Sequence, residues 1–146
     1  MKESFGGIMV NPEIINERLR EIEENLILLE ELKSTPADKF RDDPRIFKLA
    51  ERCLEVSIQA ILDICHHIIA DNCWPKPKDN QEAIDILGKH KIIPPDFART
   101  ILPMAGLRNL LVHEYARIDP SVIYQHCQDL DDFRTFQKHI VKFLNK

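Results

Sequence analysis

The chain has 146 residues, of which 44% are hydrophobic and 30% charged, and its formal net charge is −4. That length suits one domain with a single core, and the composition is typical of a soluble globular protein. The negative net charge argues against strong, nonspecific nucleic-acid binding over the whole surface. No stretch approaches the ~20 apolar residues that span a bilayer, so we expect no membrane contact and a cytoplasmic location.

The N-terminal segment contains two glycines and no long apolar run, which is not the pattern of a secretion signal. We predict a flexible N-terminal arm over residues 1–10 and a single helical domain over residues 11–146. The four cysteines have no Cys-x-x-Cys spacing, and in a reducing compartment we expect them to be free thiols.

The first helix is predicted to begin at Asn11-Pro12, because asparagine is a good N-cap and proline suits the first turn. Apolar residues then recur at alternating spacings of four and three, which indicates a long amphipathic helix. This stripe consists of Ile15, Leu19, Ile22, Leu26 and Leu29. The other face is acidic, with seven acidic residues against two arginines between Glu13 and Glu31. It is either solvated or a docking surface for a basic partner.

A break at Ser34–Ala37 precedes a second helix, which Asp43-Pro44 is predicted to start in the same way. This helix carries two apolar stripes, so we expect it to be central in a bundle or held between the core and a dimer partner. The stripes are Ile46, Leu49, Cys53, Val56, Ala60, Ile64 and Ile68, and Leu54, Ile58, Leu62 and Ile69. Asp63 lies among them, and a carboxylate there needs a basic or histidine partner on another helix.

Polar residues on the second helix allow further interpretations. Arg45, Lys48 and Arg52 share one face, where they could form ordinary ion pairs or contact an RNA backbone. The adjacent His66 and His67 point ~100° apart on a helix, so they cannot easily bind one ion. With no ligand spacing to support it, we predict neither a metal site nor a cofactor.

A loop follows at residues 71–78, where the prolines forbid regular structure. Asp79 with Glu82 is the pattern of a capping box. We expect it to open a short helix from Gln81 to Leu87, with Gly88 as the C-terminal stop.

The next helix opens at Asp96 and carries Pro103 inside it, which removes one backbone hydrogen bond and predicts a kink. The stretch that follows concentrates chemically capable side chains. Arg108 can hold a phosphate bidentately, and His113 is suited to move a proton near neutral pH. Tyr115 offers a phenol that can donate, accept or be modified.

A regular helix cannot bring these side chains together, because Arg108 and His113 lie ~140° apart at ~100° per residue. We therefore expect the helix to end or bend between Val112 and Tyr115, or the groups to meet across an interface. The section from Ile86 to Arg117 has five basic residues against two acidic ones, which suits an anionic ligand.

A final helix is predicted after Asp119-Pro120. Its apolar stripe consists of Ile123, Cys127, Leu130, Phe133, Ile140 and Leu144, with Phe136 and Phe143 alongside. No strand-like alternation persists anywhere in the chain. The fold class we predict is all-α, an up-and-down bundle of about five helices.

The pattern Arg-x-x-x-x-His-x-Tyr, from Arg108 to Tyr115, resembles the signature of the HEPN domain superfamily. The wider run to Asp119 is similar to its HepT-like toxin branch, and the resemblance covers nearly the whole chain from Asn11 on. It implies an all-helical homodimer and a metal-independent ribonuclease with its site at the dimer cleft. It also implies an antitoxin partner of the minimal nucleotidyltransferase type, which modifies Tyr115 with AMP.

Metal-independent RNA cleavage needs a base for the 2′-hydroxyl, an acid for the leaving oxygen and positive charge for the phosphorane. In one chain His113 could be base or acid but not both at once, and Arg108 could stabilise the phosphorane. Asn109 and Glu114 are candidates for supporting roles, Asn109 by binding a phosphate oxygen or orienting an imidazole. A homodimer would bring two histidines and two arginines to one cleft, so we favour dimeric catalysis.

Each of these residues also has a structural interpretation. Arg108 could pair with Asp63 or Glu114. His113 could cap the C-terminal end of its helix, where a cation is favoured, and Tyr115 could be a core ring with a bonded hydroxyl. Under that interpretation, the protein is a non-catalytic dimeric helical scaffold that binds nucleotide or protein.

Overall fold

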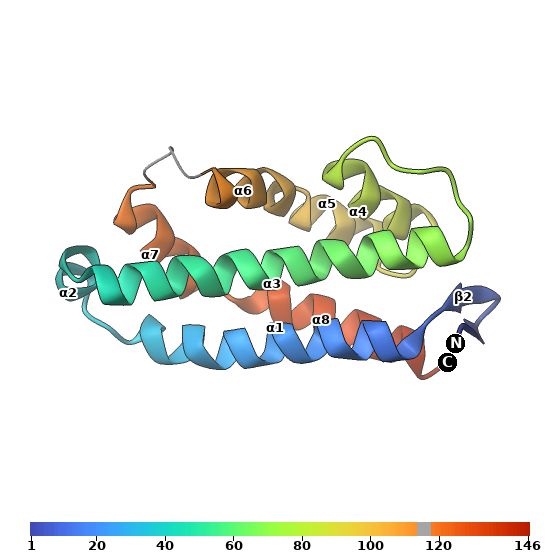
Figure 1. The fold of residues 1–146 in the computed structure, drawn as a ribbon, viewed down its shortest axis with the longest axis horizontal. Coiled ribbons are helices and arrows are strands. Elements are labelled where there is room, and N and C mark those ends of the chain that lie inside the picture. Colours follow the sequence, from blue (N-terminus) through green and yellow to red (C-terminus); the bar gives the residue numbers. More distant parts are fainter. Residues whose placement is uncertain (114–117) are drawn as a thin grey trace.

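Two long antiparallel helices, α1 (Pro12–Lys33) and α3 (Pro44–Asp71), lie side by side along the length of the molecule (Figure 1). The structure is a computed structural model and describes residues 1–113 and 118–146. A short helix, α2 (Ala37–Asp42), occupies the connection between the two long helices. This pair forms the framework on which the other elements pack.

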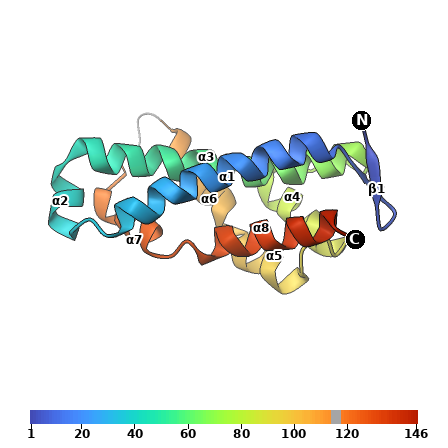
Figure 2. The same cartoon turned by 90° about the horizontal axis from the view of Figure 1, so that it is seen from below.

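The rest of the chain adds shorter helices and completes an elongated bundle (Figures 1 and 2). They are α4 (Asn80–Lys89), α5 (Pro95–Ile101), α6 (Pro103–Val112), α7 (Pro120–Gln128) and α8 (Asp131–Leu144). Helices α4 and α6 pack on α3, α5 contacts both of them, and α8 runs beside α1. The predicted helical fold class is therefore confirmed.

Capping residues set the start of both long helices, as predicted. The Asn11 side chain accepts hydrogen bonds from the backbone N–H groups of Glu13 and Ile14, at 3.1 and 3.5 Å. Asp43 accepts one from the N–H of Arg45 at 3.0 Å. A cap of this kind contributes about 1 kcal/mol, so local sequence explains where α1 and α3 begin.

Helix α3 is the centre of the core, as its two apolar stripes predicted. It contacts α1, α2, α4, α6 and α7, and its buried residues lie on more than one face. Among the described residues it is the one helix long and apolar enough to cross a membrane by length and composition alone. Most of that apolar window is buried inside the bundle, which is the arrangement of a core helix in a globular protein.

Residues 1–10, predicted to be a flexible N-terminal arm, contain regular secondary structure. Two short strands, β1 (Glu3–Phe5) and β2 (Ile8–Val10), form an antiparallel hairpin. The two-residue turn uses Gly6 and Gly7 at positive φ, the conformation that a tight hairpin requires. Asn72 holds β2 in place, because it accepts from the Met9 N–H at 2.8 Å and donates to the Met9 carbonyl at 2.7 Å.

The described residues form more helices than the five or so predicted. The segment after Thr35, expected to be a break, contains α2 with Phe40 fully buried. Pro103 interrupts its helix as predicted, but it separates α5 from α6 rather than only bending one helix. The predicted final helix is also divided, because Asp129 takes an extended conformation and its side chain accepts from the N–H of Asp131.

The connection from α4 to α5 confirms one prediction and corrects another. Asp79 caps α4 by accepting from the Glu82 N–H at 2.8 Å, as expected. Gly88, however, lies within α4 and does not end it. A Cβ atom at Gly88 would lie 2.8 Å from the Cβ of Ala98, so the glycine allows α4 and α5 to approach closely. The residue in the left-handed conformation after α4 is Lys91, with φ 58°.

All four cysteines are free thiols, in agreement with the sequence analysis. Cys53, Cys65 and Cys127 are buried, whereas Cys73 is exposed. Burial raises the pKa of Cys65 and of Cys127 to about 12. The buried thiols are therefore protonated packing groups rather than nucleophiles.

Candidate active site at the end of helix α6

The motif helix ends just before His113, which is one of the alternatives that the sequence left open. Helix α6 stops at Val112, and His113 leaves the helical conformation with φ −79° and ψ 106°. Because residues 108–112 are helical and only the ψ angle of His113 departs from helical values, Arg108 and His113 remain ~140° apart about the helix axis. Leu111 and Ala105 are buried and anchor α6 on the bundle, while His113 is exposed.

Two hydrogen bonds orient the Arg108 guanidinium. Its Nε donates to Oε1 of Gln59 on α3 at 2.9 Å, and its Nη1 donates to Oδ1 of Asn109 at 3.2 Å. The planar fork is held in one direction, which is the property that distinguishes arginine from lysine. The predicted pairing of Arg108 with Asp63 is therefore indirect, since Gln59 lies between them.

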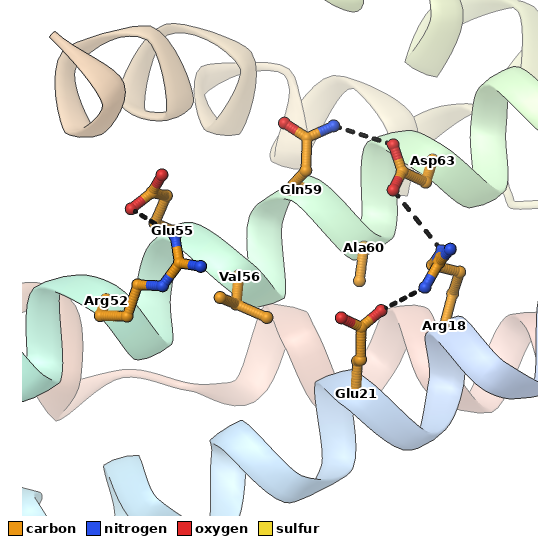
Figure 3. A pocket seen from close by; sticks show the side chains of 8 residues that line it. All are labelled: Arg18, Glu21, Arg52, Glu55, Val56, Gln59, Ala60 and Asp63. Carbon is orange, nitrogen blue, oxygen red and sulfur yellow. Dashed lines mark hydrogen bonds and ion pairs between the residues drawn. The ribbon is translucent and has the colours of Figure 1, made fainter.

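Gln59 is oriented in turn by a charged network that crosses from α3 to α1 (Figure 3). Its Nε2 donates to Oδ1 of Asp63 at 2.8 Å, so its carbonyl oxygen must face Arg108. The other oxygen of Asp63 forms an ion pair with Nε of Arg18 at 3.5 Å. This confirms the prediction that Asp63 has a basic partner on another helix. Arg18 also donates to Glu21 at 2.6 Å, and this hydrogen bond raises the pKa of Arg18.

A pocket of about 290 Å³ opens between α1 and α3 at this network (Figure 3). Two arginines and three carboxylates line it, and Arg52 pairs with Glu55 at 3.2 Å. Such a balanced set of charges does not favour an anion. Arg45 likewise pairs with Asp43 at 3.2 Å, so the ion-pair interpretation of this helix face is supported for both arginines. We infer that the residues lining this pocket are part of the framework that supports Arg108.

The structure leaves part of the predicted site outside its described residues. Glu114 and Tyr115 lie there, so their predicted roles stay predictions. Of the residues that are described, Arg108 and Asn109 meet directly and His113 follows at the end of the same helix. Among residues 1–113 and 118–146, no group of three or more His, Cys, Asp or Glu side chains could hold a metal ion. His66 instead shares a hydrogen bond of 2.9 Å with Asn80.

Gln59 was not among the site residues predicted from the sequence. A signal was available, because Gln59 and Asp63 are polar residues four apart in a helix that is otherwise largely apolar. The spacing placed them on one face but could not show that Arg108, 49 positions away, reaches the same face.

Comparisons with known proteins agree on one family. The family model described as ribonuclease HepT-like matches residues 15–140. A tRNA nuclease HepT from Aphanizomenon flos-aquae is 36% identical over 115 residues, which cover 79% of this chain and 78% of that protein. An mRNA nuclease HepT from Shewanella oneidensis is 28% identical over 87 residues, which cover 59% of this chain and 62% of that protein.

A solved structure shares the fold. It is a tri-AMPylated HEPN toxin from Shewanella oneidensis in complex with an MNT antitoxin. The TM-score is 0.78 with 22% identical residues, and the match covers 88% of this chain and 97% of that chain. At this level of identity the likeness establishes the shared fold.

Proposed function

The chain belongs to the ribonuclease HepT-like family, and on that premise we propose that it is a toxin-type, metal-independent endoribonuclease of a toxin-antitoxin system. The observation that carries the proposal is the arrangement at the end of α6. Arg108 is held in one orientation by Gln59 and Asn109, and the chain leaves the helix at His113. A cation of fixed orientation and a histidine that can transfer protons, both in the last turns of one short helix, are groups that RNA cleavage requires.

In the proposed reaction, the 2′-oxygen of a ribose attacks the adjacent phosphorus while a base removes its proton. The 5′-oxygen of the next nucleotide leaves with a proton from an acid, and a 2′,3′-cyclic phosphate remains. Arg108 stabilises the charge of the phosphorane. His113 serves as base or acid, and Asn109 keeps the guanidinium oriented while it can also bind a phosphate oxygen. Glu114 is proposed as a supporting residue.

One chain is short of a complete acid and base pair, so we propose that the active form is a homodimer. Two-fold symmetry would bring a second His113 and a second Arg108 to the same cleft. Leu110, two residues from Arg108, is 41% exposed, and a second copy of the chain would cover an apolar side chain of this kind. The dimer would thus complete the site and bury this surface.

We further propose that a minimal nucleotidyltransferase antitoxin neutralises the toxin by transferring AMP to Tyr115. The fold relative described above is an AMPylated toxin in complex with its antitoxin, which supports this assignment. An adenylate adds bulk and negative charge, and both would exclude an RNA phosphate from the cleft. The proposal predicts an adenylate-sized mass increase that is absent in Tyr115→Phe.

The test compares purified wild type and His113→Ala on total cellular RNA with a chelator present. We expect the wild type to cleave RNA and His113→Ala to lose cleavage while it keeps its helical content. His126→Ala, which removes a histidine from α7 outside the motif, is the matched control and should cleave normally. Before the assay, mass spectrometry must show that Tyr115 carries no adenylate.

Two outcomes would contradict the proposal. Cleavage by His113→Ala at the wild-type rate would remove His113 from the reaction. No cleavage by unmodified wild type would instead favour the non-catalytic dimeric scaffold that binds nucleotide or protein.

A further inference from the structure

A concentration of positive charge lies at the C-terminal end of the chain, outside the motif. From Phe133 to Lys146 there are four basic residues and no acidic one. They follow one another at intervals of four, as Arg134, Lys138, Lys142 and Lys146, and this spacing places them along one face of α8 and the turn after it. Figure 1 shows the end of α8 near the N-terminal hairpin, whereas α6 ends in the opposite half of the molecule.

A pocket of about 270 Å³ opens between the end of α8 and the connection from α4 to α5. Three lysines and a histidine line it over apolar side chains, namely Lys91, His139, Lys142 and Lys146 over Ile92 and Phe143. None of the described residues that line the pocket has a carboxylate side chain. Asp96 follows in the chain but is ion-paired with Arg99. The pocket therefore has surplus positive charge.

Lys91 reaches this pocket from a conformation that lysine rarely adopts. Helix α4 ends in a Schellman motif, in which the Ile92 N–H donates to the Leu87 carbonyl and the Lys91 N–H to the Gly88 carbonyl, both at 3.0 Å. The left-handed position of this motif is usually glycine, yet Lys91 occupies it with φ 58°. Strained residues of this kind concentrate at binding sites.

The surplus charge continues along α8 beyond the pocket. A shallower groove of about 420 Å³ lies beside it, and Lys142 lines both. Glu23 is at the edge of this groove, but Arg134 and Gln137 both donate to its Oε2, at 2.6 and 2.9 Å. Arg134 therefore offsets the negative charge of Glu23. Among the described residues, neither Lys138 nor Lys142 forms an ion pair within 4.0 Å.

We propose that Lys91, Lys138, Lys142 and Lys146, the distal basic surface, bind the phosphate groups of an RNA backbone away from the cleavage site. This inference rests on the proposed function, because it assigns the surface to the same substrate. Lysine binds phosphate as a point charge on a flexible stem, without reading the base sequence. Contacts of this kind would give a protein of net charge −4 a local binding site for a polyanion.

The extent of the surface favours RNA over other anions. From Lys138 to Lys142 the helical rise is about 6 Å, and Lys146 lies beyond the end of α8, so the lysines extend over more than a single phosphate group can span. A free nucleotide offers the same phosphate chemistry but would occupy only the pocket. Protein interfaces are depleted in lysine, so a cluster of lysines favours a polynucleotide over an acidic protein partner.

His139 supplies a local reporter for the site. Burial and the nearby charge of Lys142 lower the pKa of His139. A phosphate bound beside Lys142 would offset that charge, and the pKa of His139 would rise. The imidazole signals of His139 in an NMR titration would therefore shift with ligand.

The experiment measures the affinity of the protein for a 2′-O-methyl RNA of about 15 nucleotides, which lacks the attacking hydroxyl and cannot be cut. Wild type is compared with Lys138→Gln/Lys142→Gln and with Lys91→Gly over a range of salt concentrations. We expect the double variant to bind about tenfold more weakly, and each removed lysine to lower the salt dependence of log affinity by about 0.7. Lys39→Gln, which removes an exposed lysine from α2, is the control and should bind normally.

Lys91→Gly separates binding from folding. Glycine suits the left-handed position, so this variant should unfold at no lower temperature than wild type while it binds RNA more weakly. Unchanged affinity and salt dependence in all lysine variants would overturn the inference, even where His113-dependent cleavage is intact. If the wild type does not cut RNA but its binding depends on these lysines, the surface stands and the ribonuclease proposal fails.

Two further measurements distinguish other ligands. Inorganic phosphate and AMP are titrated while the His139 signals are followed. If either binds as tightly as the RNA and Lys138→Gln has no effect, the site takes a single free phosphate and the RNA assignment is wrong. The RNA assignment is also wrong if the lysine variants no longer bind a nucleotidyltransferase partner but bind RNA with the affinity of the wild type.

Discussion

The end of α6 and the distal basic surface both present cations, but in opposite ways. Arg108 is oriented by Gln59, which Asp63 orients in turn, and Asp63 is itself ion-paired with Arg18. The lysines around Lys142 have flexible stems and no carboxylate side chain in their pocket. Fixed orientation suits the stabilisation of charge at one point in a transition state. Surplus charge suits the capture of a polyanion in many positions.

The largest effect that would sharpen this contrast is expected from Arg108→Lys. Lysine keeps the charge but lacks the planar fork that Gln59 and Asn109 hold. We expect single-turnover cleavage to slow at least ~100-fold, with RNA affinity nearly unchanged because the distal basic surface is intact. Arg99→Lys, on the exposed side of α5, is the matched control. A normal cleavage rate in Arg108→Lys would show that charge without orientation suffices.

Gly88→Ala tests the packing that places Lys91. The added Cβ would lie 2.8 Å from the Cβ of Ala98, so α4 and α5 must separate. We expect a loss of about 1–3 kcal/mol in the free energy of unfolding, measured with urea. Gly106→Ala is the control, because a Cβ there meets nothing within 4 Å and alanine favours a helix. Equal destabilisation by both changes would contradict this reading of the contact.

Gln59→Leu tests the network while leaving the Arg108 guanidinium in place. The change removes the hydrogen bonds to Arg108 and to Asp63 but keeps a similar volume. We expect kcat to fall roughly tenfold, about 1.4 kcal/mol, with a smaller change in KM, because orientation and not substrate contact is lost. Gln125→Leu on α7 should have no effect. If kcat is unchanged in Gln59→Leu, Asn109 alone orients Arg108.

Lys91→Gly should have a smaller effect and the opposite sign on stability. Relief of the left-handed strain should raise the free energy of unfolding by up to ~1 kcal/mol. Lys89→Gly should lower it, because Lys89 lies in the last turn of α4 and pairs with Asp85 at 3.2 Å. If Lys91→Gly has a lower free energy of unfolding than Lys89→Gly, Lys91 is not strained in the wild type, and strain cannot be related to binding.

The smallest effect concerns pH. Burial lowers the pKa of His126 and of His139, and Lys142 adds to the effect at His139. Because the unfolded chain takes up protons at these histidines before the folded protein does, stability should fall as the pH drops below about 6.5. Chemical denaturation at several pH values should show a shallower fall for His126→Gln/His139→Gln. An identical pH profile in that variant would exclude these histidines as the cause.

Local sequence was enough to predict the helical framework. Asn11 and Asp43 cap α1 and α3 as expected, because a cap depends on residues two or three positions away. Pro103 interrupts its helix, because a proline acts on the nearest backbone groups, and α6 ends at Val112, which is one of the outcomes that the sequence left open. The division of the last helix at Asp129 escaped prediction, since the apolar stripe continues across it.

The supporting parts of both sites depend on contacts that the tertiary structure alone decides. Gln59 meets Arg108 across 49 positions, and Asn72 holds β2 across 63. Lys91 and Lys142 line one pocket, although Lys91 lies in the connection after α4 and Lys142 lies on α8. Periodicity shows which face of a helix is apolar, but the packing of helices determines which polar residues of two faces meet. The sequence therefore determined the helices and the reactive side chains, whereas only the folded bundle decided what orients Arg108.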